Sequence, residues 1–379
     1  MNKQILAVVI LIIAVSVYYS GCTGKSAGTS TSVPTPSSTV AAAPDFTKLN
    51  PACFHASSSN PILGANSQFS GADWNDPSVI KVGNQYVMYA TSDHNFDFNI
   101  GVYRLVSSDS QNWSLSPTTP VLQANSDTTA WDARAVETPS VVYFNGKYHL
   151  FYIGYPLLIG SHTVTYADSY AYKIGHAVSD DGITWTRDSS YILAPTNPDT
   201  PTAATNPDVA GGLPFNQYVV GEPAPVVFQN KIYLYFTAIG ANASVNNRLQ
   251  VIGVMTSSDG STWSAPQSVL IPDQTVYPSS NWQGYSTPSA IVLDGKVHLF
   301  FDVAQRSPWR QLKITHASSA DGLSGWTLDA TPIFSNTDFA WTSNEIRSPA
   351  ALLDGTTLKL WFAGDNSSVL GIGSASCSL

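Results

Sequence analysis

The amino-acid sequence predicts an all-β fold, a five-bladed β-propeller whose fifth blade is closed by a strand from the start of the folded region. Composition gives the first indication, because the 379 residues include 26 Gly and 24 Pro while only 11% are charged. Such a chain suits short strands joined by tight turns better than helices. The second indication is a strand–turn–strand unit that occurs five times, which is typical of a repeat architecture.

Each repeat contains a proline, an apolar run, a polar turn and a second apolar run. The repeated prolines are Pro77, Pro139, Pro223, Pro288 and Pro349, and Met or Leu follows each of them by eleven positions. Some of the turns carry Asn-Gly or Asp-Gly pairs, which favour tight β-hairpins. A second hairpin, marked by a Ser-Asp turn with a Trp shortly after it, brings each of the first four blades to four strands.

The fifth repeat ends the chain at its third strand, so its fourth strand must come from elsewhere. We expect residues 46–56, at the start of the folded region, to supply it and to close the ring. Cys53 lies in that segment and Cys377 lies near the end of the last strand. Two otherwise isolated cysteines in an exported chain are disulfide candidates, and a Cys53–Cys377 bridge would lock the closure.

The first 22 residues predict export. Lys3 precedes an apolar run over residues 5–19, and Tyr19-Ser20-Gly21-Cys22 is similar to a lipobox in which Cys22 becomes lipidated. Simple secretion and an uncleaved anchor are the alternatives, although fifteen apolar residues are short for a membrane span of about twenty. Residues 23–44 form a Ser/Thr/Pro-rich linker, which leaves 45–379 as the propeller. The predicted location is extracytoplasmic, either on the cell surface through the lipid or secreted.

The charge balance excludes some partners. A net charge of −9 with only 17 Lys and Arg provides no basic patch for nucleic acid, and membrane contact is expected only through the N-terminal lipid. We expect a monomer. The cysteines lack the neighbours of a metal site, so no metal ligands are predicted.

The repeat phase predicts a catalytic site at one mouth of the central channel, where the innermost strands begin. Asp76 and Glu222 directly precede their prolines, while Glu137 and Arg347 lie one position earlier in the repeat. Cleavage of a glycosidic bond needs a pair of carboxylates, and a third would tune the pKa of the acid. The alternative is that these acids merely accept hydrogen bonds at strand starts. The candidate substrate-binding residues are Trp74, Asn75, Trp131, Arg134, Trp282, Ser286, Trp341 and Arg347; for the tryptophans, packing between blades is the competing interpretation.

These motifs resemble the five-bladed propeller glycoside hydrolases of families 43 and 32, the superfamily of arabinanases, levansucrases and invertases. Trp74-Asn75-Asp76-Pro77 looks like the Asp-Pro opening of blade 1 in those families, which implies a base or nucleophile at Asp76. The resemblance implies a general acid at Glu222. Glu137 departs from the family 43 modulator, an Asp just after the proline, and its Glu-Thr-Pro spacing resembles the acid motif of family 32. Arg134-Ala135-Val136-Glu137 is also faintly similar to the mannoside phosphorylases of family 130, without their full motif.

The resemblance implies hydrolysis of arabinan, xylan or galactan-type carbohydrate, with fructan as the second choice and with either inversion or retention. No cofactor is required, although some family 43 members hold Ca²⁺ in the channel with a His. The rival hypothesis is a non-catalytic carbohydrate-binding propeller. Long loops over 154–173 and 190–220 flank blades 2 and 3, and we expect them to wall one side of the cleft.

Overall fold

The computed structural model describes residues 43–379, except 65–72, 93–99, 165–170, 197–214 and 243–246. The predicted signal over 1–22, its lipidation site Cys22 and almost all of the linker over 23–44 lie outside the described residues, so these assignments stay predictions. Residues 42–379 form one compact unit. Within the described part of the chain, no helix is long and apolar enough to cross a membrane.

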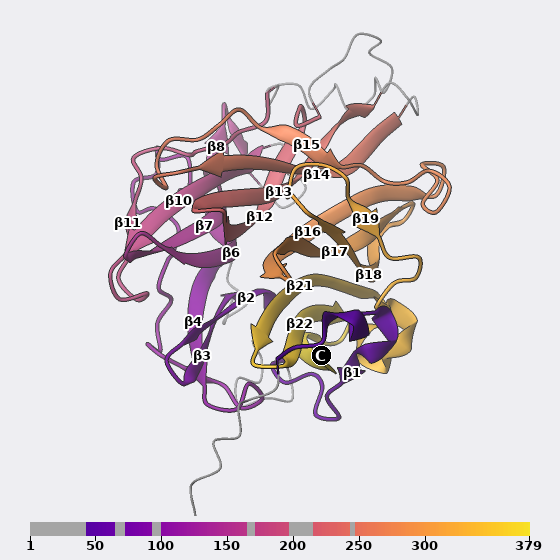
Figure 1. The fold of residues 1–379 in the computed structure, drawn as a ribbon. Helices are drawn as coiled ribbons and strands as arrows, with labels where there is room; N and C mark the ends of the chain where they lie inside the picture. Colours follow the sequence, from indigo (N-terminus) through magenta and orange to yellow (C-terminus); the bar gives the residue numbers. More distant parts are fainter. Residues whose placement is uncertain (1–42, 65–72, 93–99, 165–170, 197–214, 243–246) are drawn as a thin grey trace, which may run out of the picture. The chain divides into compact units, whose positions relative to one another are not determined.

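The described residues form strands and short 3-10 helices, with no α-helix among them (Figure 1), as the all-β prediction requires. Two antiparallel sheets of four strands come first: β2 (Trp74–Val82), β3 (Gln85–Ser92), β4 (Gly101–Ser107) and β5 (Ser114–Leu115), then β6 (Ala135–Phe144), β7 (Lys147–Tyr155), β10 (Lys173–Ser179) and β11 (Thr186–Arg187). A small hairpin, β8 (Leu158–Ile159) with β9 (His162–Thr163), extends from the second sheet's loop.

A nine-stranded sheet follows, made of two hairpin groups joined by a single parallel bridge between Gln250 and Gly284. Its strands are β12 (Val219–Phe228), β13 (Lys231–Asn242), β14 (Asn247–Ser257), β15 (Gln267–Leu270), β16 (Trp282–Leu293), β17 (Lys296–Arg306), β18 (Trp309–Ser319), β19 (Thr327–Leu328) and β20 (Phe334–Ser335). The last sheet has the order β1 (His55–Ala56), β23 (Leu370–Ser378), β22 (Thr357–Asp365) and β21 (Glu345–Asp354). The 3-10 helices are η1 (Phe46–Lys48), η2 (Pro51–Cys53), η5 (Asn336–Asp338) and η6 (Ala340–Thr342).

The first strand of each predicted repeat contacts the first strand of the next. Strand β2 contacts β6, β6 contacts β12, β12 contacts β16, β16 contacts β21, and β21 contacts β2 again. The five proline-bearing strands are therefore linked by contacts in a cyclic order. Residues at equivalent positions of these strands consequently come close together although they are 60 to 85 residues apart in sequence.

The hairpin turns adopt the conformations that their sequences predict. Asn145 and Gly146 have φ values of 47° and 84°, and Asp294 and Gly295 have 48° and 69°, which is the doubly left-handed backbone of a type I′ turn. In the Asp-Gly turns between the third and fourth strands, the aspartate side chain accepts backbone hydrogen bonds. Asp181 Oδ1, for example, accepts 2.8 Å bonds from the amides of residues 183 and 184.

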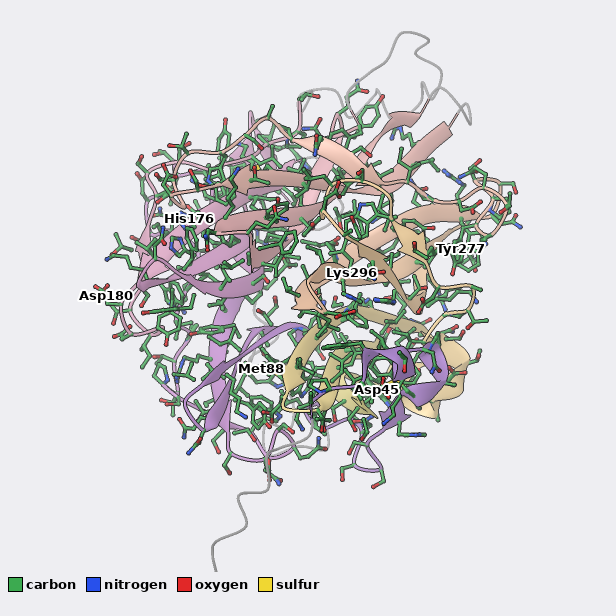
Figure 2. The ribbon with its side chains drawn as sticks, in the orientation of Figure 1. Asp45, Met88, His176, Asp180, Tyr277 and Lys296 are labelled. Carbon is green, nitrogen blue, oxygen red and sulfur yellow. A yellow bond between two sulfur atoms is a disulfide. The ribbon has the colours of Figure 1, made fainter. Side chains whose placement is uncertain are left out.

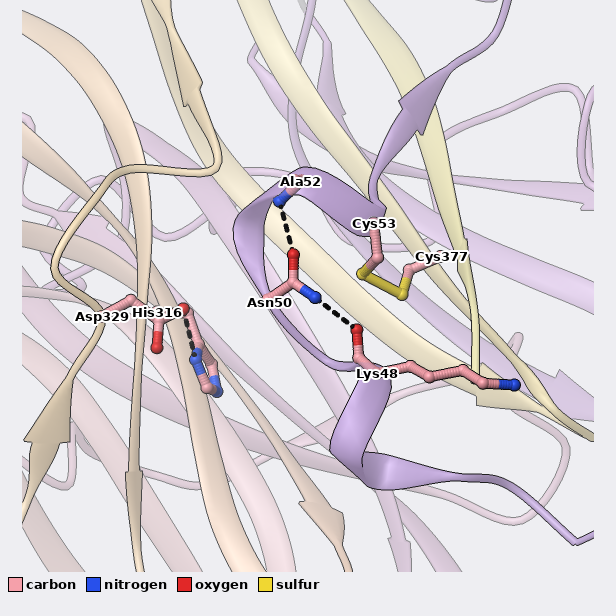
Figure 3. The surroundings of a disulfide bond; sticks show 7 residues. All are labelled: Lys48, Asn50, Ala52, Cys53, His316, Asp329 and Cys377. Carbon is pink, nitrogen blue, oxygen red and sulfur yellow. Dashed lines mark hydrogen bonds and ion pairs between the residues drawn. A yellow bond between two sulfur atoms is a disulfide. The ribbon is translucent and has the colours of Figure 1, made fainter.

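The N-terminal segment joins the C-terminal strands as predicted (Figure 1). Strand β1 pairs antiparallel with β23, which places His55 opposite Ser376. Cys53 and Cys377 form a disulfide with their Cα atoms 5.0 Å apart (Figure 3). Beside it, the Asn50 side chain accepts a bond from the Ala52 amide and donates one to the Lys48 carbonyl, fixing the turn that precedes the cysteine.

The hydrophobic core lies within and between the sheets, and Figure 2 labels one buried and one exposed side chain, Met88 and Asp180. Met88 on β3 is fully buried, whereas the Asp180 side chain in the turn after β10 is 84% exposed. Two of the Asp-Gly turns are held by a tyrosine of the preceding repeat. Trp326 lies edge-on to Tyr235, whose hydroxyl donates to the Gly322 carbonyl at 2.7 Å, and Tyr89 bonds the Gly182 carbonyl in the same way.

Four histidines on the second and third strands of two sheets form hydrogen-bonded chains. His149 and His176 stack with a 2.9 Å contact between ring nitrogens, and His176 bonds Asp188. A second chain of the same kind joins His298, His316 and Asp329. Both chains lie within the sheets, away from the proline-bearing strand starts.

Candidate functional site

The residue before each repeated proline has a left-handed backbone. The φ values are 50° at Asp76, 49° at Thr138, 52° at Glu222, 44° at Thr287 and 51° at Ser348. All five inner strands show a register shift at this place, the mark of a β-bulge. Left-handed backbone is unfavourable for residues other than Gly, costing about 1–3 kcal/mol each, and such outliers cluster at functional sites. The bulges re-aim the side chains that precede the prolines.

These strand starts line a cavity of about 870 Å³, a volume typical of small-molecule sites. Its lining includes all three predicted catalytic carboxylates, Asp76, Glu137 and Glu222, and two predicted substrate-binding residues, Asn75 and Arg347. Thr287 of the fifth inner strand, β16, lines it too, so the phase of the repeats brings residues from all five inner strands to one cavity. The chain contains only three glutamates, and the third, Glu345, forms an ion pair with Arg347 at the same place.

Asp76 is held by hydroxyl donors. Its two carboxylate oxygens accept bonds from Thr91 Oγ1 at 3.0 Å and from Ser348 Oγ at 2.8 Å. Burial raises the pKa of Asp76, and the hydrogen bonds together with the Arg347 charge oppose that rise. The carboxyl is therefore oriented from both sides in a mostly desolvated position.

Glu222 is half-buried on the opposite part of the ring of strands. Its Oε2 accepts a 3.1 Å bond from the Thr287 amide, and the Thr237 hydroxyl bonds the same carboxyl. Burial raises the pKa of Glu222, and the negative charge of Asp76 raises it further. A carboxyl in this environment can retain a proton at neutral pH.

Glu137 has the strongest electrostatic contact with the other two acids. Burial, followed by the charges of Asp76 and Glu222, raises its pKa to about 8, while Arg347 and a hydrogen bond with Tyr172 oppose the shift. Tyr172 belongs to the loop over 154–173 and lines the cavity, as the loop prediction requires. Tyr166 and Tyr170 of that loop lie outside the described residues.

A fourth carboxylate, Asp302, was missed at the level of sequence. It lies fourteen residues after Pro288, the position that carries Thr91 and Thr237 in two other repeats. Those threonines accept hydrogen bonds from the amides of Thr138 and of Thr287, at 2.8 and 2.9 Å. An acid at the position fourteen residues after the proline, where other repeats carry threonine or an apolar residue, can be seen in the same repeat alignment that identifies Asp76.

The wall of the cavity between β14 and β18 is cationic and aromatic. Arg248 and Arg306 line it, with the Arg248 guanidinium 4.0 Å from the centroid of the Tyr218 ring. Arg306 donates to the backbone carbonyls of Ser279 and Arg248 at 2.7 and 2.8 Å. Trp309, in the hairpin between β17 and β18, is 50% exposed and also lines the cavity. None of these residues follows the repeat phase, so the alignment of repeats did not point to them.

The structure corrects the predicted role of three tryptophans. Trp131 stacks on Tyr152, and a Cβ added at Gly154 would lie 2.7 Å from its ring. Trp341 covers the equivalent Gly364 in the same way. A glycine in each strand leaves a flat backbone face that an indole fills, so these rings pack between strands instead of facing the cavity. Trp74 is fully buried against Tyr103.

The remaining predicted binding residues are also absent from the described cavity lining. Trp282 packs edge-on against Tyr277, Ser286 is fully buried and donates to Asp302, and Arg134 Nε donates to the Val164 carbonyl at 3.2 Å. In the part of the chain that the structure describes, no group of three or more His, Cys, Asp or Glu is arranged to hold a metal ion.

Comparison with known proteins gives a consistent fold. No family model matches the chain. A curated relative, the beta-1,2-mannobiose phosphorylase of Thermoanaerobacter sp., is 26% identical over 142 residues, which are 37% of this chain and 41% of the length of that relative.

The solved structures match over most of their length. A thermostable family-43 glycoside hydrolase superposes with a TM-score of 0.58 at 16% identity, covering 80% of this chain and 89% of that one. The endo-arabinase from Bacteroides thetaiotaomicron gives 0.53 at 17% identity, with coverages of 81% and 94%. A family 117 glycoside hydrolase from Zobellia galactanivorans gives 0.56 at 15%, with 86% and 90%. The structural neighbours of this chain are thus glycoside hydrolases of family 43 and related propeller families, and the chain has their fold.

Proposed function

We propose that residues 45–379 form a five-bladed β-propeller which hydrolyses glycosidic bonds of extracellular oligo- or polysaccharide. The cyclic contacts of β2, β6, β12, β16 and β21 support the five blades, and the β1–β23 pairing with the Cys53–Cys377 disulfide supports closure of the ring. The observation that carries the function is the convergence of Asp76, Glu137 and Glu222 in one cavity of the size a sugar requires.

The environments of the acids support distinct roles. Glu222, whose pKa is raised by burial and by Asp76, is proposed as the general acid that protonates the leaving glycosidic oxygen. Asp76, oriented by Thr91 and Ser348, is the proposed base. Glu137 modulates the pKa of the pair or is the alternative acid, because its own pKa of about 8 also lets it hold a proton.

In the inverting form of this mechanism, Asp76 removes a proton from water as the water oxygen bonds to the anomeric carbon. The bond from that carbon to the leaving oxygen breaks at the same time, and Glu222 transfers its proton to that oxygen. Asp76 ends protonated and Glu222 ends ionised, so solvent must exchange one proton at each carboxyl before the next turnover. Retention, with Asp76 as the nucleophile, is the second form.

Substrate identity is proposed from the neighbours and from the wall of the cavity. Arabinan, xylan or galactan-type chains are the first choice, and fructan is the second. Trp309 offers a half-exposed indole at the rim, where a sugar ring could stack in place of the tryptophans that pack in the core.

The test is turnover on a panel of aryl glycosides and polysaccharides by the wild type, Asp76→Asn and Glu222→Gln. Asp294→Asn is the matched control, since Asp294 lies exposed in a hairpin turn whose left-handed backbone Asn also tolerates. We expect both site variants to lose at least about 10³-fold in kcat, with the control unchanged. Sugar binding without turnover by the wild type would instead favour the non-catalytic carbohydrate-binding propeller.

Phosphorolysis is a second candidate, favoured by the curated relative and by the three arginines that line the cavity, Arg248, Arg306 and Arg347. The same panel with and without inorganic phosphate separates the two reactions. A sugar 1-phosphate product would identify a phosphorylase, whereas free sugar formed at the same rate without phosphate would identify a hydrolase.

We further propose that the protein reaches the cell exterior as a lipoprotein through Cys22, acts as a monomer and needs no cofactor. Release of Cys22→Ser into the medium, the size of the purified protein in solution, and activity after treatment with EDTA test these three points. Activity lost to EDTA and restored by Ca²⁺ would support an ion in the channel.

A further inference from the structure

Asp302 is a fully buried carboxylate in the middle of β17, next to the proposed site. Four donors from neighbouring strands point at it. The Ser286 hydroxyl donates to Oδ1, while the Thr287 hydroxyl, the Gln311 side-chain amide at 3.0 Å and the Ser348 backbone amide at 3.3 Å donate to Oδ2. A buried carboxylate with this many partners fixes the strands around it, because each lost partner would leave a desolvated polar atom.

Two of the residues that donate to Asp302 also bond the proposed catalytic acids, each through a different atom. The Thr287 amide donates to Glu222 Oε2 at 3.1 Å, and the Ser348 hydroxyl donates to Asp76 Oδ1 at 2.8 Å. Ser348 and Thr287 are further joined by a 3.2 Å bond from the amide of Ser348 to the hydroxyl of Thr287. Asp302 is therefore connected to each acid through one intervening residue.

The two intervening residues occupy the left-handed positions before Pro288 and Pro349, where the backbone is strained. Such a conformation persists only where surrounding contacts hold it. The Asp302 side chain contacts both residues, since it bonds the Thr287 hydroxyl and the Ser348 amide at once.

We propose that Asp302 is a positioning residue that fixes Glu222 and Asp76 relative to each other through Thr287 and Ser348. The inference deepens the proposed function and rests on it for the roles of the two acids. It assigns a function to a fourth carboxylate that touches no substrate.

Glu222 also acts on Asp302 by charge. Burial and the Glu222 charge raise the pKa of Asp302 to about 8. The strands packed against it present only neutral partners (Ser286 and Thr287 from β16, Gln311 from β18 and Ser348 from β21). The other charged groups that interact with Glu222 are Asp76, Glu137 and Arg347. In a pair of interacting carboxylates the upper apparent pKa carries the repulsion, so Asp302 is still protonated when Glu222 ionises, and loss of the Asp302 carboxyl alone should leave the pKa of Glu222 unchanged.

Two substitutions separate charge from geometry. In Asp302→Asn, the amide oxygen can occupy the place of Oδ2 and accept from Thr287, Gln311 and Ser348, while the NH₂ group faces the Ser286 hydroxyl, which can accept. The hydrogen bonds are kept and the charge is lost. Asp302→Ala loses both. Asp294→Asn, at the other end of the same hairpin, is the control for loss of a carboxylate.

The first measurement is NMR titration of protein labelled with ¹³C at the glutamate side-chain carboxyl. Three signals are expected, one for each of Glu137, Glu222 and Glu345, and Glu222→Gln assigns the second by its disappearance. We expect Asp302→Ala to raise the apparent pKa of Glu222, because release of Thr287 weakens the amide bond that lowers this pKa, and Asp302→Asn and Asp294→Asn to leave it unchanged. An unchanged Glu222 titration in Asp302→Ala would contradict the positioning role, whether or not the protein turns over a substrate.

The second measurement is the pH profile of kcat and KM on the substrate found in the panel. Asp302→Asn should keep kcat at its optimum within about threefold and leave the pH profile unchanged, because the hydrogen bonds are kept. Asp302→Ala should lose about 10- to 100-fold in kcat with KM changed by less than about threefold, as misplaced catalytic groups do. Wild-type kcat in Asp302→Ala would contradict the positioning role.

If Asp302→Ala fails to fold, Ser348→Ala and Thr287→Val replace it in this test. Each of these variants removes one hydroxyl from the hydrogen-bonded path between Asp302 and the two acids. A loss of kcat in these variants that is absent in Ser289→Ala, a neighbouring serine outside this path, supports the inference, and equal losses in all three refute it. A wild type without turnover would contradict the proposed function alone, because the NMR result does not depend on turnover.

Discussion

Glu137→Gln should stabilise the protein at neutral pH and do so more strongly as the pH rises. The pKa of Glu137 is raised from 4.5 to about 8 in the folded state. Between these two values the unfolded chain is ionised and the folded chain is not, so each pH unit disfavours folding by about 1.36 kcal/mol. The full interval of 3.5 units would cost about 4.8 kcal/mol.

The carboxyl is half-buried and borders an open cavity, so solvent reduces this penalty, and we expect about 2 kcal/mol at pH 7.5. Glutamine removes the ionisation and keeps an oxygen that can accept the bond of Tyr172. Below pH 4.5 both states are protonated and the gain should vanish, whereas above pH 8 it should reach its maximum.

The assay is chemical unfolding of wild type, Glu137→Gln and the control Asp294→Asn at intervals from pH 4.5 to 8. The free energy of unfolding of Glu137→Gln should diverge upward from that of the wild type as the pH rises. A difference that is constant over this range, or that favours the wild type throughout, would refute the reasoning about Glu137. Turnover of the same variant should fall, which would show that the chain trades stability for an acid at this position.

Three further predictions follow from other parts of the structure. Trp309→Ala should raise KM about fivefold, equivalent to about 1 kcal/mol of lost apolar contact, with little change in kcat or in thermal stability. Steady-state kinetics measure this change, and an unchanged KM on every substrate would show that Trp309 does not bind substrate. Replacing both Cys53 and Cys377 by serine should lower the free energy of unfolding by up to about 5 kcal/mol in the chain-entropy model, because the bridge spans 324 residues. Chemical unfolding of the oxidised wild type and of the variant measures the difference, and equal midpoints would contradict this prediction. Burial and His316 lower the pKa of His298 from 6.5 to about 4, so the free energy of unfolding should fall as the pH drops from 6.5 to 4, because the unfolded chain takes up the proton first. Over that range His298→Gln should lose about 2 kcal/mol less than the wild type, and equal losses in both proteins would contradict the lowered pKa of His298.

The sequence predicted the three carboxylates and the arginine at the strand starts of the cavity, because they follow a period. One alignment of repeats, anchored on the prolines, placed Asp76, Glu137, Glu222 and Arg347 at equivalent strand starts. The structure brings all four to one cavity. The same alignment contains Asp302, fourteen residues after its proline, but this position lies inside the second strand and not at a strand start.

The tryptophans show where such an alignment fails. Spacing from the proline correctly put Trp131 and Trp341 in the segments that lead into the inner strands, but it carries no information about the direction of a ring. That direction depends on partners from other strands, namely the glycine faces at Gly154 and Gly364. Trp309 was missed for the opposite reason, since it follows the turn between β17 and β18, and the connections at this place differ in length among the repeats.

The left-handed position before the proline has a consequence for how such a site can change over generations. Within this one chain the same backbone conformation carries Asp, Thr, Glu, Thr and Ser, with φ values that differ by less than 10°. The local geometry is therefore set by the bulge and the proline and not by the side chain that it presents. A single amino-acid substitution at any of these five positions can exchange the chemistry at the channel mouth without rebuilding the strand. New arrangements of acids and hydroxyls are thus accessible one residue at a time, on a scaffold that has already accepted each of them.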